Sequence, residues 1–84
     1  MTDALVDRVS SILSEVLKAK GVERSAFLPE DRLYEDGLGL DSLDAATLAA
    51  MLDNAFGSDP YNAGEFPQTV GELISFYAGT KANG

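Results

Sequence analysis

The stretch GLGLDSLDAA, residues 37–46, contains the side chain with the clearest chemical potential in this sequence. Ser42 lies between Asp41 and Leu43, after two glycines and before a helical pattern. A serine in such a place can be a nucleophile, an ordinary helix-start residue or an acceptor for another enzyme. Because the chain has no histidine and no cysteine, a nucleophilic serine would have no imidazole to activate it. On these ten residues alone, the helix-start interpretation is the simplest.

The patterns of common catalytic and metal sites are missing as well. The sequence has no Ser-x-x-Lys pair, no G-x-S-x-G elbow and no P-loop, and the tripeptide at 37–39 lacks the third glycine of a dinucleotide fingerprint. An EF-hand loop starting at Asp31 would place Leu33 at its third position and Asp36 at its invariant glycine. We therefore predict that the protein is not an enzyme and has no metal site.

Composition sets the size and the charge of the protein. An 84-residue chain makes one small domain, residues 1–84, with one modest core. The net charge is −8, and residues 30–72 hold ten acidic side chains but only one basic side chain, Arg32. This sign excludes a nucleic-acid partner and suits a basic protein partner, although acidic surfaces also simply keep small domains soluble. Without a bilayer-spanning run or a signal peptide, we expect a cytoplasmic monomer with no membrane partner.

Several helices must position Ser42. Asp41 is the predicted N-cap of the helix that follows it, and Gly57 the predicted end of that helix. Asp59 followed by proline favours a short helix at 59–63. Residues 79–84 are expected to form a flexible tail. Apolar residues at helical spacing predict the three main helices, at 3–19, 42–56 and 69–78.

The long connection at 20–41 is not one helix, because it contains Pro29, Gly37 and Gly39. Its apolar side chains predict an ordered loop anchored to the core. Tyr61 and Phe66 are expected to anchor the next connection in the same way. No alternating strand pattern is present, so the predicted class is all-α, a four-helix bundle of three main helices and a short third helix. The anchors expected in the long loop are Phe27, Leu28, Leu33, Leu38 and Leu40.

The order of these features resembles that of acyl carrier proteins. The segments LYEDGLGLDSL, DAATLAAMLDNAF and TVGELISFY carry the resemblance, which covers residues 3–78. In that family a DSL triplet opens the second helix of a carrier bundle. The resemblance implies that Ser42 is the attachment serine for a 4'-phosphopantetheine arm. It also implies that a separate phosphopantetheinyl transferase supplies the arm from coenzyme A.

The resemblance further implies what the arm does and which enzymes meet it. The arm's thiol would carry acyl or aminoacyl groups as thioesters, from a loading enzyme to downstream synthase or tailoring enzymes. These partners would recognise the loop before Ser42, the exposed face of the helix that begins at Ser42, and the short helix at 59–63. By position, that partner face consists of Asp41, Leu43, Asp44, Ala46, Thr47 and Ala50.

The composition of the partner face bears on the pathway. Carriers of fatty-acid synthesis typically have acidic residues along this face, whereas Thr47, Ala50 and Asn54 occupy the corresponding places here. We therefore predict a free-standing carrier of polyketide or nonribosomal-peptide metabolism, with a fatty-acid-synthesis carrier as the alternative. A non-covalent acidic helical adaptor is the alternative of a different class. That adaptor leaves the glycine-leucine approach to an exposed serine unexplained.

Two hypotheses concern the arm and its cargo. Asp41 and Asp44 place two negative charges at a helix N-terminus, whose dipole contributes about half a positive charge. We therefore expect that the phosphate is not held there and that the arm is mobile. The small residues Ala45, Ala46 and Ala49 could leave room for cargo between helices, although close helix packing is the simpler interpretation.

Overall fold

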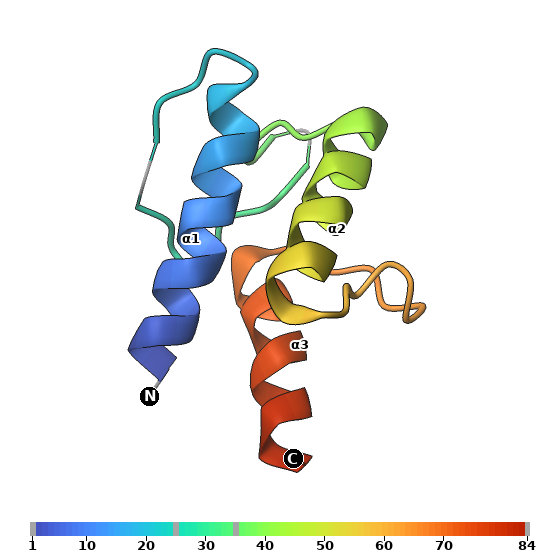
Figure 1. The fold of residues 1–84 in the computed structure, drawn as a ribbon. Helices are drawn as coiled ribbons and strands as arrows, with labels where there is room; N and C mark the ends of the chain where they lie inside the picture. The colour runs from blue at the N-terminus through green and yellow to red at the C-terminus, as the bar shows by residue number, and fades with distance from the viewer. Residues whose placement is uncertain (1, 25, 35, 84) are drawn as a thin grey trace.

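The computed structural model describes residues 2–24, 26–34 and 36–83, and within these ranges the side chains of residues 4–78. The described part is all-α, which confirms the class predicted from the sequence. α1 packs directly against both other helices, and the N-terminal end of α1 lies at the same end of the molecule as the C-terminal end of α3 (Figure 1). None of the described helices is long and apolar enough to cross a membrane. The three helices are α1 (Thr2–Lys18), α2 (Ser42–Phe56) and α3 (Val70–Asn83).

The helix boundaries differ from the predicted ones mainly at the C-terminus. α2 begins and ends where the sequence predicts. α3 continues to Asn83 and so extends past the expected end at residue 78. Nothing in the added segment breaks a helix, because it contains no proline, and Gly79 costs only about 1 kcal/mol relative to alanine. The flexibility of residues 79–84 stays a prediction.

Residues 60–64 form consecutive hydrogen-bonded turns instead of the predicted short third helix. Asp59 caps these turns as expected, since its Oδ1 accepts a hydrogen bond from the Asn62 amide at 2.8 Å. Gly64 then adopts a φ of 85°, a left-handed conformation that ends helical geometry. The described part of the chain therefore has three helices, and the prediction of a fourth is wrong.

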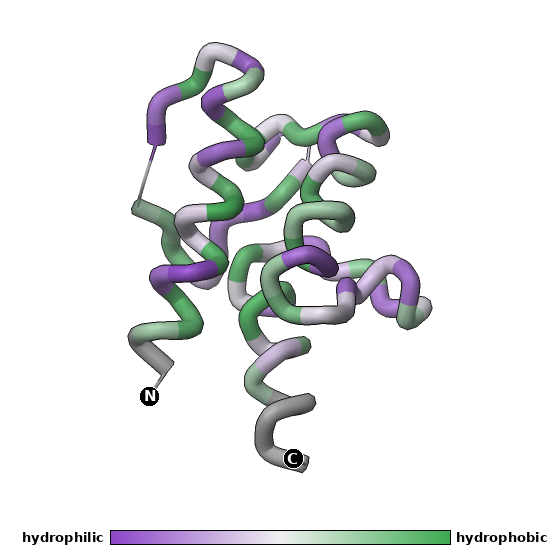
Figure 2. Tube along the Cα trace, in the orientation of Figure 1, coloured by the Kyte–Doolittle hydropathy of each residue, from purple (hydrophilic) through white to green (hydrophobic). Residues whose placement is uncertain are grey.

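One hydrophobic core lies between the helices and the loop that joins α1 to α2. Figure 2 shows hydrophobic and hydrophilic residues alternating around α1, as expected for a helix with one buried face. Burying a leucine side chain stabilises a fold by about 1.5–3 kcal/mol, so the loop leucines hold the loop to the helices. The buried core consists of Val9, Ile12, Leu13, Val16, Leu17, Leu33, Leu38, Leu40, Leu48, Leu52, Val70, Leu73 and Tyr77.

The predicted loop anchors are confirmed only in part. Leu28 is 56% exposed and Phe66 is 67% exposed, so the anchoring predicted for these two side chains is wrong. Leu28 lies in a turn closed by two hydrogen bonds with Asp31, and the Phe66 ring meets the edge of the Tyr61 ring at 6.1 Å between centroids. The anchors that the structure confirms are Phe27, Leu33, Leu38, Leu40 and Tyr61.

An aromatic cluster joins the C-terminal end of α2 to α1 and α3. The rings of Phe56 and Tyr77 stack with their centroids 4.3 Å apart. The Arg8 guanidinium lies 4.5 Å from the centre of the Phe56 ring and donates a hydrogen bond to the Ala55 carbonyl at 2.8 Å. The Tyr77 hydroxyl donates to the Ser58 carbonyl at 2.8 Å. These contacts hold the end of α2 opposite to Ser42 and so fix the direction of the helix.

Candidate functional site

Ser42 is the first residue of α2 and lies on the surface. The Asp41 side chain caps the helix, because its Oδ1 accepts a hydrogen bond from the Asp44 amide at 2.9 Å. Asp44 completes a capping box, since its Oδ2 accepts from the Asp41 amide at 3.0 Å. The sequence predicted the first of these two bonds and missed the second. Together they hold the backbone on both sides of the serine.

The Ser42 hydroxyl is accessible at the surface of the protein. Within the described part of the chain, its Oγ has no hydrogen-bond partner. Leu43, the next residue, is 75% exposed, so the surroundings of the serine open to solvent. The described residues also include no group of three or more histidine, cysteine, aspartate or glutamate side chains placed to hold a metal ion. This geometry suits a hydroxyl that another protein modifies and leaves room for a large covalent group.

The loop before Ser42 is held by its own backbone and by the core. The Leu38 amide donates to the Arg32 carbonyl at 2.7 Å, and the Leu40 amide donates to the Leu33 carbonyl at 3.0 Å. The side chains of Leu38 and Leu40 are both buried. The residues that lead to Ser42 are thus anchored, as the sequence predicted, so the position of the serine is defined before α2 begins.

The first turn of α3 holds the other side of this loop. The Val70 amide donates to the Asp31 carbonyl, and the Gly71 amide donates to the Pro29 carbonyl, each at 2.9 Å. The first amides of a helix have no partner within the helix, and the loop carbonyls satisfy two of them here. The sequence offered no signal for this contact, because it depends on where α3 packs.

Gly37 allows the loop to pass close to its own backbone. A Cβ atom at this position would clash with the Arg32 carbonyl oxygen, far inside contact distance. We expect Gly37→Ala to lower the free energy of unfolding by about 3 kcal/mol or more, the upper end of the cost of forcing a group into packed space, because the contact is with backbone atoms that cannot rotate away. Urea denaturation measures the loss.

Gly64→Ala is the control for Gly37→Ala. Gly64 has a φ of 85°, but a Cβ atom there would meet nothing within 4 Å. Its substitution carries only the conformational cost of a left-handed residue, about 1–2 kcal/mol. If Gly37→Ala proved no more destabilising than this and left the rate of Ser42 modification unchanged, the close contact with Arg32 would not explain why glycine is needed.

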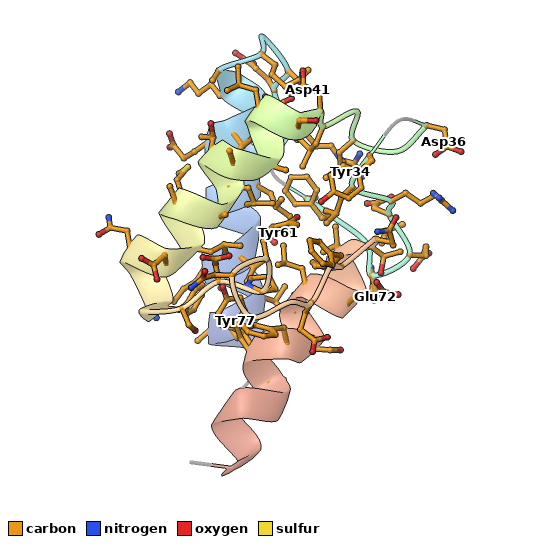
Figure 3. The ribbon with its side chains drawn as sticks, turned by 90° about the vertical axis from the view of Figure 1, so that its right-hand side faces the viewer. Tyr34, Asp36, Asp41, Tyr61, Glu72 and Tyr77 are labelled. Atoms are coloured by element: carbon orange, nitrogen blue, oxygen red, sulfur yellow. The ribbon has the colours of Figure 1, made fainter. Side chains whose placement is uncertain are left out.

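Tyr34 in the loop and Tyr61 in the 60–64 turn meet through their hydroxyl groups, whose oxygens lie 2.6 Å apart (Figure 3). Burial, with the hydrogen bond to Tyr34, raises the pKa of Tyr61 well above its ordinary value, so this phenol stays protonated near neutral pH. Tyr34 also forms an isolated bridge with Leu40. The pair therefore ties the turn to the loop that presents Ser42.

Removing either hydroxyl should reveal this contact. We expect Tyr34→Phe and Tyr61→Phe each to lower the free energy of unfolding by about 1 kcal/mol, because each leaves the other hydroxyl without its partner. The double variant should lose less than the sum of the two. A double-mutant cycle from urea denaturation measures the coupling, and strictly additive losses would speak against a direct bond.

The structure places most of the predicted partner face on the surface. Thr47 is exposed, but its hydroxyl donates a hydrogen bond to the Leu43 carbonyl at 3.1 Å within the helix. The hydroxyl proton of Thr47 is therefore already used within α2. Ala46 is exposed as well and cannot line a space between helices, which removes one of the three alanines from the cargo hypothesis. Asp44 is only partly exposed. The exposed members of the face are Asp41, Leu43, Ala46, Thr47 and Ala50.

Lys20 lies at the site although the sequence analysis did not assign it there. Its Nζ atom is 2.7 Å from Asp44 Oδ2. The hydrogen bond with Lys20, followed by that with the Asp41 backbone, lowers the pKa of Asp44, and the bond with Asp44 raises the pKa of Lys20. Both groups are therefore ionised at neutral pH. One of the two charges on which the mobile-arm hypothesis depends is thus paired, and the mobility itself stays a prediction.

Comparison with known proteins agrees with this geometry. The family described as "Phosphopantetheine attachment site" matches residues 7–61, which include Ser42. An acyl carrier protein of Prochlorococcus marinus (strain MIT 9515) is 32% identical over 80 residues, which are 94% of this chain and 95% of that protein. No solved structure matches the chain significantly. The two matches imply covalently attached 4'-phosphopantetheine as the cofactor, and we conclude that the chain belongs to the phosphopantetheine-binding family of acyl carrier proteins.

Proposed function

We propose that Ser42 bears the 4'-phosphopantetheine group and that the protein carries thioester-bound acyl or aminoacyl intermediates between enzymes. The exposed hydroxyl of Ser42, free of described partners at the first turn of α2, carries the proposal. The capping box of Asp41 and Asp44 supports it, because it stabilises this turn through backbone amides and leaves Oγ available. When attached, the group supplies a terminal thiol that can form thioesters.

The chain's own part in the attachment step is that of an acceptor. A bond forms between Ser42 Oγ and the phosphorus atom next to the pantetheine of coenzyme A, and the pyrophosphate bond breaks with adenosine 3',5'-bisphosphate as leaving group. The hydroxyl proton passes to a base of the phosphopantetheinyl transferase, because this sequence contains no histidine and the neighbouring carboxylates of Asp41 and Asp44 already accept capping hydrogen bonds. The remaining partners are enzymes that load and process acyl groups, and the carrier meets them as a cytoplasmic monomer.

The exposed face of α2 supports a proposal about the pathway. Ala46, Thr47 and Ala50 are exposed and uncharged, which favours a dedicated carrier of polyketide or nonribosomal-peptide metabolism. The similarity to an acyl carrier protein is equally compatible with fatty-acid synthesis. Intact mass of the protein purified from its own cells distinguishes these pathways by the cargo on the arm. A simple saturated acyl series would contradict the specialised pathway.

One experiment tests the attachment itself. The protein is incubated with a broad-specificity phosphopantetheinyl transferase, coenzyme A and Mg²⁺, and its intact mass is measured. We expect a gain of one phosphopantetheine unit per chain. If the mass stays unchanged under conditions that fully modify a control carrier, the carrier function is wrong, and a non-covalent acidic adaptor becomes the better explanation.

A further inference from the structure

The Asp44 carboxylate is already engaged within the protein. Its Oδ2 accepts hydrogen bonds from Lys20 Nζ at 2.7 Å and from the Asp41 amide at 3.0 Å. The Asp44 side chain is only 15% exposed, and Lys20 is 30% exposed. A cation of a partner enzyme can gain from this carboxylate only if it displaces Lys20 or shares the site with it.

The other two acidic side chains of α2 and its cap differ from Asp44. Asp41 and Asp53 are exposed, and neither forms an ion pair with a described cation. Asp41 lies before the first turn of α2 and Asp53 lies in its last turn. The exposed surface of α2 between them is uncharged, because its side chains are Ser42, Leu43, Ala46, Thr47 and Ala50. Of these three carboxylates of α2 and its cap, Asp44 alone is paired with a described cation, Lys20.

Lys20 reaches this surface from a different part of the chain. Residues 1–29 contain four acidic and four basic side chains, whereas the acidic excess lies in residues 30–72. The fold brings Lys20 from the balanced segment to Asp44, and in the same way it brings Arg24 to Asp31. Two carboxylates of the acidic segment 30–72, those of Asp31 and Asp44, are consequently paired with cations from outside that segment.

We propose that Lys20 is a specificity-determining residue that masks Asp44 from basic side chains of partner enzymes. With Lys20 in place, the Ser42 turn favours partners that recognise the uncharged face of α2 over partners that dock by cations. The inference rests on the proposed function, because the enzyme that modifies Ser42 must approach this turn. It assigns to Lys20 a role in partner choice and not in the chemistry of attachment.

The test compares wild type, Lys20→Met, Asp44→Asn and the double variant as acceptors for one phosphopantetheinyl transferase with a basic docking surface. Methionine keeps a long apolar side chain and removes the ammonium group. We expect Lys20→Met to raise kcat/KM about two- to five-fold at low ionic strength through a lower KM, because one carboxylate becomes available to the enzyme. The gain should disappear at high salt, where exposed charges are screened.

Lys18→Met is the matched control for net charge. Lys18 lies two residues earlier, is exposed and forms no ion pair with a described carboxylate. It should leave kcat/KM nearly unchanged, and Asp44→Asn should cancel the gain of Lys20→Met. Equal gains from the two lysine substitutions would assign the effect to net charge and overturn the proposal. A gain that persists in the double variant would overturn it too.

A second measurement tests the masking without any transferase. NMR titration of the Asp44 carboxyl should give a higher pKa in Lys20→Met than in wild type, and no change in Lys18→Met. An unchanged pKa in Lys20→Met would overturn the proposal even if the protein is modified normally. Conversely, a wild-type protein that no transferase modifies would contradict the carrier function, while the titration would still decide whether Lys20 holds Asp44.

Discussion

Ser42→Ala is expected to abolish the attachment of phosphopantetheine while the protein stays folded. The substitution removes the acceptor oxygen, so no gain in intact mass should follow incubation with transferase, coenzyme A and Mg²⁺. Stability should change by no more than about 0.5 kcal/mol, because the Ser42 hydroxyl is exposed and has no described hydrogen-bond partner. Thermal unfolding followed by circular dichroism verifies that the fold is retained.

Ser11→Ala is the control for this prediction. Ser11 is also an exposed helical serine, but it lies in α1 and outside the capped first turn of α2. This variant should gain one phosphopantetheine unit, as the wild type does. If Ser42→Ala still gained a unit, the attachment would occur at another residue and the proposed role of Ser42 would be wrong.

Leu52→Ala is expected to cause a large loss of stability. Leu52 is completely buried, and replacing a buried leucine with alanine costs about 2–5 kcal/mol through lost burial and the cavity that remains. A domain of this size has only about 5–15 kcal/mol of total stability, so much of it would be lost. The urea midpoint measures this loss, provided that the slope of the transition is unchanged.

Leu43→Ala makes the same chemical change in the same helix at a side chain that is 75% exposed. It should change the free energy of unfolding by no more than about 0.5 kcal/mol. The difference between the two variants isolates the effect of burial, because helix propensity changes equally in both. Similar losses would mean that α2 does not pack with Leu52 toward the core.

Local interactions explain why several features of the site could be predicted. The helix from residue 42 to residue 56 depends on the apolar stripe of Leu48 and Leu52, on the Asp41 cap and on Gly57, all within or next to that segment. Each signal acts over one or two helical turns, a range at which sequence spacing corresponds directly to spatial proximity. The exposed serine at the start of α2 follows from the same signals.

Predictions beyond this range were less successful. The expected short helix at 59–63 depended on Asp59 and Pro60, and both occupy their expected places at the start of a turn. A left-handed Gly64 and the contact of Tyr61 with Tyr34 decide the rest of that segment. Phe66 was expected in the core because it is large and apolar, yet the core is completed by other side chains and Phe66 stays exposed.

By itself, the sequence determined the helices near Ser42, the class of the fold and the exposure of the serine, because these features depend on residues close together in the chain. Only the tertiary structure decided the partners of the site. Lys20 and Asp44 are 24 residues apart, and Tyr34 and Tyr61 are 27 residues apart. Such pairs form where packing of α1, α2 and the loop brings distant segments together, and no local spacing encodes that distance.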